Sequence, residues 1–245
     1  MIELTIVTVN FNSGGGLKLT VDSLSDFIAD PKVEFILIDA CSTDESSVFI
    51  NQRKNIFDVL VIEPDKGIYD AMNKAIKRAS GKWIWFVNSG DIVLAACKPL
   101  LTFLALSEIK STVVYSDLVL PNDNVVKQKC NKLFFIRRMM NHQNIIYSSD
   151  LLVGGYDLSF KYCADFAHMV RSLKKTSFNK YSEKLCMYDL DGFSSNRSYR
   201  TRRIIWKERY RAMRNSDSFF INCFGAAFAF FVFNFFWLLN LVKGA

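Results

Sequence analysis

Short runs of consecutive apolar residues alternate with segments of helical periodicity along the first half of the chain. Such runs are typical of strands that are buried on both faces of a sheet. We predict strands of this kind at residues 33–39 and 83–87, a short β-branched strand at residues 3–9, and a further strand at residues 57–62. Helices are predicted between them at about 17–28 and 44–52, the second capped by Thr43 or Asp44, and from Ile68 to a stop at Gly81. This order predicts right-handed crossovers and a largely parallel sheet.

The pattern becomes mixed after residue 91. Two β-like runs, 112–120 and 125–129, lie on either side of a turn and indicate a hairpin. The other predicted elements are helices near 98–107 and over 162–174 and strands at 144–148 and 179–187. Partly antiparallel structure is therefore expected in this half.

The last 48 residues combine a basic segment with an apolar one. A helix is predicted over 198–214, where seven arginines and lysines are interspersed with apolar residues. No charged residue follows between 218 and 242, a stretch longer than the ~20 apolar residues that span a bilayer. Because Asn222, Asn234 and Asn240 interrupt it, a helix lying in the membrane interface is an alternative. Either way, the preceding basic residues should stay on the cytoplasmic side.

Composition narrows the class of protein. With 245 residues, half of them hydrophobic, the chain can bury one sizeable core. The net charge of +7 suits nucleic acid, anionic membranes or phosphorylated substrates, but its position beside the apolar tail favours a membrane surface. No nucleic-acid-binding module is recognisable, so a nucleic-acid partner is not expected. The six cysteines are scattered without a CxxC pair, which indicates reduced cytosolic thiols. Met1 leads directly into a strand, so we expect no signal peptide.

Residues 63–91 contain the main candidate chemistry. A turn at Asp65-Lys66-Gly67 precedes the helix that begins at Ile68, and the strand 83–87 ends in Asn88-Ser89-Gly90-Asp91. Loops at the carboxyl ends of parallel strands are the usual ligand site of open α/β sheets. A carboxylate on such a turn can hold a divalent cation, which in turn can bind a diphosphate.

Four motifs follow one another in this order: 8–12 (TVNFN), 39–44 (DACSTD), 65–73 (DKGIYDAMN) and 88–91 (NSGD). In order and spacing they resemble family 2 glycosyltransferases of the GT-A fold, in the bacterial branch that builds surface polysaccharides such as O-antigen, capsule and colanic acid. The resemblance implies an α/β, Rossmann-like, mostly parallel sheet with flanking helices, followed by the basic helix and a membrane-associated apolar tail. We expect a GT-A domain over 1–195, with a nucleotide-sugar half (1–95) and an acceptor half (96–195), then the basic segment 196–217 and the tail 218–245.

The resemblance also implies nucleotide-sugar contacts from residues of all four motifs: Thr8, Asn10, Asp39, Asp65, Gly67, Asp70, Asn73 and Asn88. Each has a structural alternative. For Thr8 and Asn10 it is strand-end structure, and for Asp39 it is capping of the turn that follows. The acidic residues of segment 65–73 would also complement the dipole of the helix that starts there. Asp44 is assigned to helix capping instead.

Asp91 is the predicted ligand of Mg²⁺ or Mn²⁺. Many members of the family have Asp-X-Asp here, whereas this chain has Asn88 in the first position if the motifs are aligned. A neutral amide is a weaker ligand for these cations than a carboxylate. We therefore expect a lower metal affinity than a pair of acids would give.

An inverting transfer needs a base for the acceptor hydroxyl, and the resemblance implies Asp165 in this role, with Asp157 as the alternative. Ala164 stands where many relatives have a second acid. His142 is assigned either to acceptor or phosphate binding or to structure, and His168 to structure. Arg197 and Arg200 are candidates for diphosphate binding, with a membrane-facing surface as the alternative.

The sequence thus predicts an inverting hexosyltransferase at the cytoplasmic face of the bacterial inner membrane. The expected donor is a nucleotide-sugar, with a UDP-sugar as the first choice, and the expected acceptor is a polyprenyl-diphosphate-linked saccharide. One alternative is a polyprenyl-phosphate sugar synthase. Another is a non-catalytic, membrane-tethered scaffold of a polysaccharide assembly complex, which Asn88 and Ala164 favour.

Overall fold

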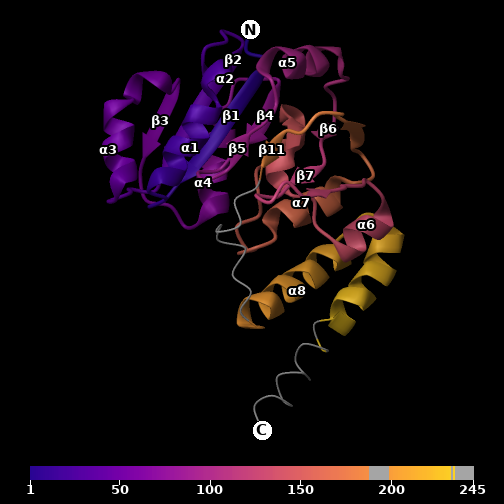
Figure 1. Ribbon diagram of the computed structural model, residues 1–245. Helices are drawn as coiled ribbons and strands as arrows, with labels where there is room; N and C mark the ends of the chain where they lie inside the picture. Colours follow the sequence, from indigo (N-terminus) through magenta and orange to yellow (C-terminus); the bar gives the residue numbers. More distant parts are fainter. Residues whose placement is uncertain (188–198, 233, 235–245) are drawn as a thin grey trace. The chain divides into compact units, whose positions relative to one another are not determined.

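The computed structural model describes residues 1–187, 199–232 and 234 (Figure 1). They form two compact units. The first contains residues 1–128, 141–156 and 177–187, and the second contains residues 129–140, 157–176 and 199–232 with residue 234.

A seven-stranded sheet forms the centre of the first unit, with strand order β10-β6-β9-β4-β1-β2-β3. Its strands are β1 (Leu4–Asn10), β2 (Val33–Asp39), β3 (Val59–Ile62), β4 (Trp83–Phe86), β6 (Thr112–Tyr115), β9 (Ile145–Ser148) and β10 (Ser177–Lys180). β1 to β4 are parallel, as the alternating pattern predicted, and β9 runs antiparallel between β4 and β6. Every residue of β1, β2 and β4 is buried, as predicted for the segments 33–39 and 83–87.

The helices of the first unit are α1 (Gly15–Ser23), α2 (Ser25–Ile28), α3 (Glu45–Gln52), α4 (Ile68–Ile76) and α5 (Cys97–Leu106), with short 3₁₀ turns η1 (Lys54–Ile56), η2 (His142–Asn144) and η3 (Ser149–Leu152). The Asp44 side chain caps α3 by accepting from the Ser46 N–H at 3.0 Å, as predicted. The predicted helix 17–28 is divided at Leu24.

The role predicted for Gly81 as the end of a helix is wrong. α4 ends five residues earlier, at Ile76. A Cβ atom at Gly81 would lie 2.6 Å from the Thr5 backbone nitrogen. Glycine is therefore needed for close approach of this segment to β1.

A second, four-stranded sheet of the first unit has the order β5-β11-β7-β8. Its strands are β5 (Ile92–Val93), β7 (Leu118–Val119), β8 (Val125–Val126) and β11 (Cys186–Met187). β7 and β8 form the predicted hairpin. The single strand predicted over 179–187 is wrong, because β10 joins the large sheet and β11 the small one.

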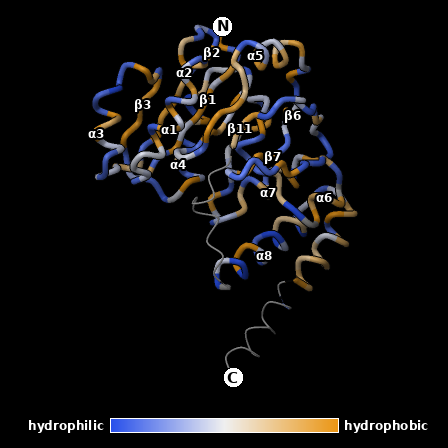
Figure 2. The backbone as a smooth tube through the Cα atoms, viewed as in Figure 1, coloured by the Kyte–Doolittle hydropathy of each residue, from blue (hydrophilic) through white to orange (hydrophobic). Residues whose placement is uncertain are grey.

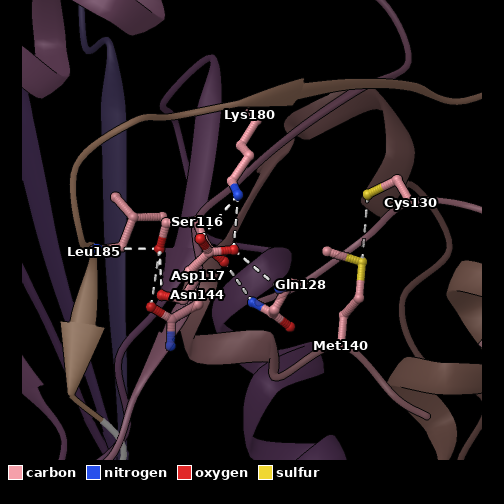
Figure 3. Close-up of polar contacts among 8 residues, drawn as sticks. All are labelled: Ser116, Asp117, Gln128, Cys130, Met140, Asn144, Lys180 and Leu185. Atoms are coloured by element: carbon pink, nitrogen blue, oxygen red, sulfur yellow. Dashed lines mark hydrogen bonds and ion pairs between the residues drawn. The ribbon is translucent and has the colours of Figure 1, made fainter. Parts of the chain in front are cut away.

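A buried polar cluster ties the segments of both sheets together (Figure 3). The Ser116 hydroxyl donates to Asn144 Oδ1 at 3.1 Å and accepts from the Leu185 N–H at 3.1 Å. Gln128 Nε2 donates to the Ser116 carbonyl at 2.6 Å. Buried polar groups are stable only when paired in this way, so the cluster fixes where the chain leaves β6 and returns to β11.

The second unit is helical. It contains α6 (Lys132–Arg137), α7 (Ala164–Ser172), α8 (Tyr199–Arg214) and a helical stretch over 219–232 that includes a π-helical turn, η5 (Ile221–Gly225). α8 packs against α7 and against the helical stretch, where Trp206 and Phe228 have ring centroids 6.0 Å apart. Figure 2 shows polar and apolar positions alternating along α8, whereas residues 219–232 are mostly apolar. None of the described helices is both long and apolar enough to span a bilayer. Of the predicted tail 218–245, residues 233 and 235–245 lie outside the described residues.

Candidate active site

Polar side chains gather where β1 and β2 end. The two strands are parallel with Asn10 opposite Asp39, so both strand ends lie at one edge of the sheet. Asn10 Nδ2 donates to Asp39 Oδ1 at 2.7 Å, and both residues are buried. The hydroxyl of Thr8, two residues earlier on β1, donates to the Val87 carbonyl at 2.8 Å. Asn10 and Asp39 thus meet at the edge where a ligand is expected.

Asp39 organises the loop that follows it. Its Oδ2 accepts from the Ser42 N–H at 2.8 Å and its Oδ1 from the Ser42 hydroxyl at 2.6 Å. The Ser42 hydroxyl in turn accepts from the Asn12 N–H at 2.9 Å. A carboxylate offers about four acceptor positions, so this arrangement leaves room for one further donor. The capping alternative is observed, and the nucleotide contact of Asp39 stays a prediction.

The turn between Asn88 and Asp91 is held by α1. The Gly90 N–H donates to the Thr20 hydroxyl at 2.9 Å, and that hydroxyl donates to the Asp91 carbonyl at 2.8 Å. Gly90 has φ 103°, and a Cβ atom on Gly16 would lie 3.3 Å from the Cα atom of Gly90. Both glycines are therefore needed for this approach. We did not single out Thr20 from the sequence, where its only signal is a polar residue on a buried helix face.

Oxygen atoms gather around Asp91. This carboxylate is buried, and its Oδ2 accepts from the Asn88 N–H at 3.2 Å. Asn88 Nδ2 lies 3.0 Å from His142 Nε2. Within the described part of the chain, Asn88 Oδ1 and Ser89 Oγ are buried without a hydrogen-bond partner. Hard divalent cations prefer oxygen ligands of these kinds.

A complete set of metal ligands is not provided by the residues that the structure describes. Among the described residues, no group of three or more His, Cys, Asp or Glu side chains could hold a metal ion. The residues present therefore fit a cation that shares its coordination with a phosphate ligand, as Mg²⁺ commonly does.

The residues predicted around the start of α4 stabilise that start. Asp65 Oδ1 accepts from the N–H of Gly67, whose φ is 115°, at 2.8 Å. Asp70 Oδ2 accepts from the Lys66 N–H at 3.0 Å. Asn73 pairs instead with the backbone of a distant loop. The carboxylates of Asp65 and Asp70 thus hold the turn that precedes α4, and nucleotide contacts by these residues stay predictions.

Asp165 belongs to the second unit, where it lies buried in the first turn of α7. Asp157, the alternative base, accepts from the Ser159 N–H at 2.9 Å. Hydrogen bonds from Ser159 hold the pKa of Asp157 below its usual value, which makes it a weaker base. His168 is on α7 and Arg200 is exposed on α8, while Arg197 lies outside the described residues. The assignment of the base to Asp165, with Asp157 as the alternative, stays a prediction.

Two relatives are similar to most of the chain. An uncharacterized glycosyltransferase of Mycobacterium tuberculosis is 29% identical over 205 residues, which cover 79% of this chain and 78% of the relative. A PGL/p-HBAD biosynthesis glycosyltransferase of Mycobacterium bovis is 30% identical over 182 residues, 68% of each chain.

Solved structures share the fold. Staphylococcus aureus TarS in complex with UDP-GlcNAc aligns with a TM-score of 0.67 at 17% identity, over 89% of this chain and 68% of that chain. The mannosyltransferase PcManGT of Pyrobaculum calidifontis, in complex with GDP-Man and Mn²⁺, aligns with a TM-score of 0.64 at 15% identity, over 93% of this chain and 72% of that chain. The family model for glycosyl transferase family 2 matches residues 5–155, which include the carboxyl ends of β1, β2 and β4. The chain therefore belongs to glycosyl transferase family 2 and is a glycosyltransferase with a GT-A-like fold.

Proposed function

We propose that the protein is an inverting hexosyltransferase that takes its sugar from a UDP-sugar with the help of Mg²⁺ or Mn²⁺. The observation that carries this proposal is the group of oxygens around Asp91, at the carboxyl end of β4 in a chain of this family. The UDP-GlcNAc bound to TarS and the Mn²⁺ bound to PcManGT support the choice of donor and ion.

Asp91, Asn88 and Ser89 would hold the cation together with the donor's diphosphate. A bound divalent ion neutralises the charge that develops on a departing nucleoside diphosphate. Asn10, at the end of the adjacent strand β1, and Asp39, at the end of the next strand β2, are proposed to contact the nucleoside. The predicted contacts of Thr8, Asp65, Gly67, Asp70 and Asn73 are part of the same proposal.

Asp165 is proposed as the base. It would take the proton from the acceptor hydroxyl as that oxygen attacks the anomeric carbon on the side opposite the diphosphate. The bond from the sugar to the diphosphate breaks in the same step, which inverts the anomeric centre. A buried carboxylate in the first turn of α7 suits this role, because it is shielded from bulk water.

The proposed acceptor is a polyprenyl-diphosphate-linked saccharide in bacterial surface polysaccharide synthesis, at the cytoplasmic face of the inner membrane. The names of relatives in PGL/p-HBAD biosynthesis support a role in cell-envelope glycan assembly. Exposed phenylalanines on residues 219–231 beside the basic helix α8 support work at a lipid surface.

Calorimetry on the full chain in detergent tests the donor site, with UDP, GDP and CDP, each with and without Mn²⁺. Wild type should bind UDP in a Mn²⁺-dependent manner, and Asp91→Asn should weaken this binding at least about tenfold, because it removes one ligand charge. Asp22→Asn is the matched control, since Asp22 is an exposed residue of α1 whose carboxylate pairs with Lys18. Equal binding by the wild type and the Asp91 variant would contradict the assignment of Asp91.

Asp165→Asn separates catalysis from binding. We expect it to bind UDP and Mn²⁺ like the wild type but to transfer sugar about 10²- to 10⁴-fold more slowly, the usual contribution of a positioned base. Transfer is measured by product mass with a panel of UDP-sugars and lipid-linked acceptors. Product with a single phosphate and no acceptor saccharide would indicate a polyprenyl-phosphate sugar synthase instead.

A further inference from the structure

His142 lies beside the turn from Asn88 to Asp91, although it is 54 residues away from Asn88 in sequence. It begins η2, which leads directly into β9. β9 runs antiparallel to β4, so the residues before β9 lie at the carboxyl end of β4. Trp85 Nε1 donates to the Gln143 carbonyl at 2.7 Å and fixes this turn to β4. The position of His142 is therefore set by the sheet itself.

The contact between His142 and Asn88 has a direction. The amide nitrogen of asparagine can only donate, so at 3.0 Å the ring nitrogen Nε2 of His142 must accept. The amide oxygen, Asn88 Oδ1, points elsewhere and has no hydrogen-bond partner among the described residues. The ring nitrogen thus decides which end of the amide stays available.

We infer that His142 is a positioning residue for the donor: it orients the Asn88 amide so that Oδ1, and not the amide nitrogen, is presented to the cation and diphosphate. This inference rests on the proposed function. A carboxylate in place of Asn88 would need no such orientation, because both of its ends are oxygens. His142 therefore compensates for the two unlike ends of the neutral amide at position 88.

A purely structural histidine would have different consequences. Its loss would destabilise the turn equally, whether residue 88 is asparagine or aspartate. A positioning histidine matters only while residue 88 has two unlike ends. The two roles are therefore separated by measuring His142 variants in both backgrounds, as a double-mutant cycle.

The test is calorimetry of UDP binding to the full chain, with and without Mn²⁺, in wild type, His142→Ala, Asn88→Asp and the double variant. His142→Ala should weaken Mn²⁺-dependent binding about tenfold in the Asn88 background and less than about twofold in the Asn88→Asp background. UDP binding without Mn²⁺ should not change. His142→Gln, which offers an acceptor oxygen to the amide, should retain binding within about threefold. His168→Ala is the control, since His168 is the chain's only other histidine.

Unfolding midpoints of all variants are measured first. If His142→Ala does not fold, His142→Leu fills the space without offering an acceptor. Equal weakening in both backgrounds, or weakening that does not depend on Mn²⁺, would overturn the positioning role. Failure of the wild type to bind UDP with Mn²⁺ would overturn the proposed function as well, whereas binding indifferent to His142 would overturn this inference alone.

Discussion

Gly155 leaves the space in which the Asn73 side chain pairs with the backbone. Asn73 Nδ2 donates to the Tyr156 carbonyl at 2.9 Å, and Asn73 Oδ1 accepts from the Tyr156 N–H at 2.7 Å. Gly155 has φ 69°, and a Cβ atom there would lie 2.5 Å from Asn73 Oδ1. A side chain at Gly155 would thus strain the backbone and break this pair of hydrogen bonds.

We expect Gly155→Ala to lower the free energy of unfolding by about 1–3 kcal/mol, from backbone strain and the weakened pair. Urea denaturation followed by circular dichroism measures it. Gly15→Ala is the matched control. Gly15 lies in α1, and a Cβ atom there would meet no atom within 4 Å. Equal stability of the two variants would show that the Asn73 contact does not constrain the loop.

Single residues were predictable from the sequence where they follow a strand. Asn10 and Asp39 end buried parallel strands and Asp91 lies in the turn after β4, and the ends of such strands share one edge of the sheet. Thr20 and His142 were not predictable in their roles, because their contacts join segments 54 to 71 residues apart. Only the folded sheet brings these segments together.

At the scale of elements, a side chain of α8 accepts the hydrogen bonds that an N-cap side chain of α7 does not. The N-cap residue of α7 is Cys163, whose side chain makes no capping hydrogen bond. The buried carboxylate of Glu208 instead accepts from the N–H groups of Lys161, Tyr162 and Cys163 at 2.8, 2.9 and 3.0 Å. A negative charge at a helix N-terminus is also favoured by the helix dipole. Glu208 thus fixes the segment that leads to Asp165.

Glu208→Ala should lower the free energy of unfolding of the second unit by about 2–4 kcal/mol, because three N–H groups lose a charged acceptor. Hydrogen exchange at the amides of residues 161–163 should accelerate correspondingly. Asp217→Ala is the control, since Asp217 is an exposed acid of the same unit. Unchanged exchange at these amides in the Glu208 variant would show that the Glu208 carboxylate does not hold them.

Element types were predictable wherever a local pattern determines them. The buried strands β1, β2 and β4 and the capped helix α3 follow from apolar runs and Asp44. The division of segment 179–187 between two sheets was not predictable. β10 pairs with β6, and β11 pairs with β5 and β7, and such long-range pairing leaves no local signal in the strand's own sequence.

For the whole molecule, membrane binding by the basic helix α8 and the apolar segment after it depends on which of their side chains are exposed. Not every cation of α8 is available to a membrane. The Arg209 guanidinium is buried between the rings of Phe166 and Trp206, 4.6 Å from each centroid, and burial lowers its pKa to about 10. Arg211 lies 3.8 Å over the Phe160 ring. The exposed cations of α8 are those away from these contacts, such as Arg200, Arg202 and Lys207.

Exposed aromatic side chains in the same unit complete a surface suited to lipid. Phe219, Phe224 and Phe231 are 77%, 60% and 70% exposed. Apolar side chains of this size gain free energy by entering the interface, and nearby Lys and Arg each add about 1 kcal/mol on an anionic membrane. We therefore expect the protein to bind vesicles that contain phosphatidylglycerol and to bind phosphatidylcholine vesicles more weakly.

Cosedimentation with vesicles measures this binding for the full chain and for a variant with serine at Phe219, Phe224 and Phe231. The variant should bind at least about tenfold more weakly, since three large apolar side chains no longer enter the interface. Leu106→Ser is the control, because Leu106 is an equally exposed apolar residue of the first unit. High salt should weaken the preference for phosphatidylglycerol, because the contribution of the exposed cations is screened. Binding that is unchanged in the triple variant and independent of lipid charge would mean that residues 219–231 are not the membrane contact.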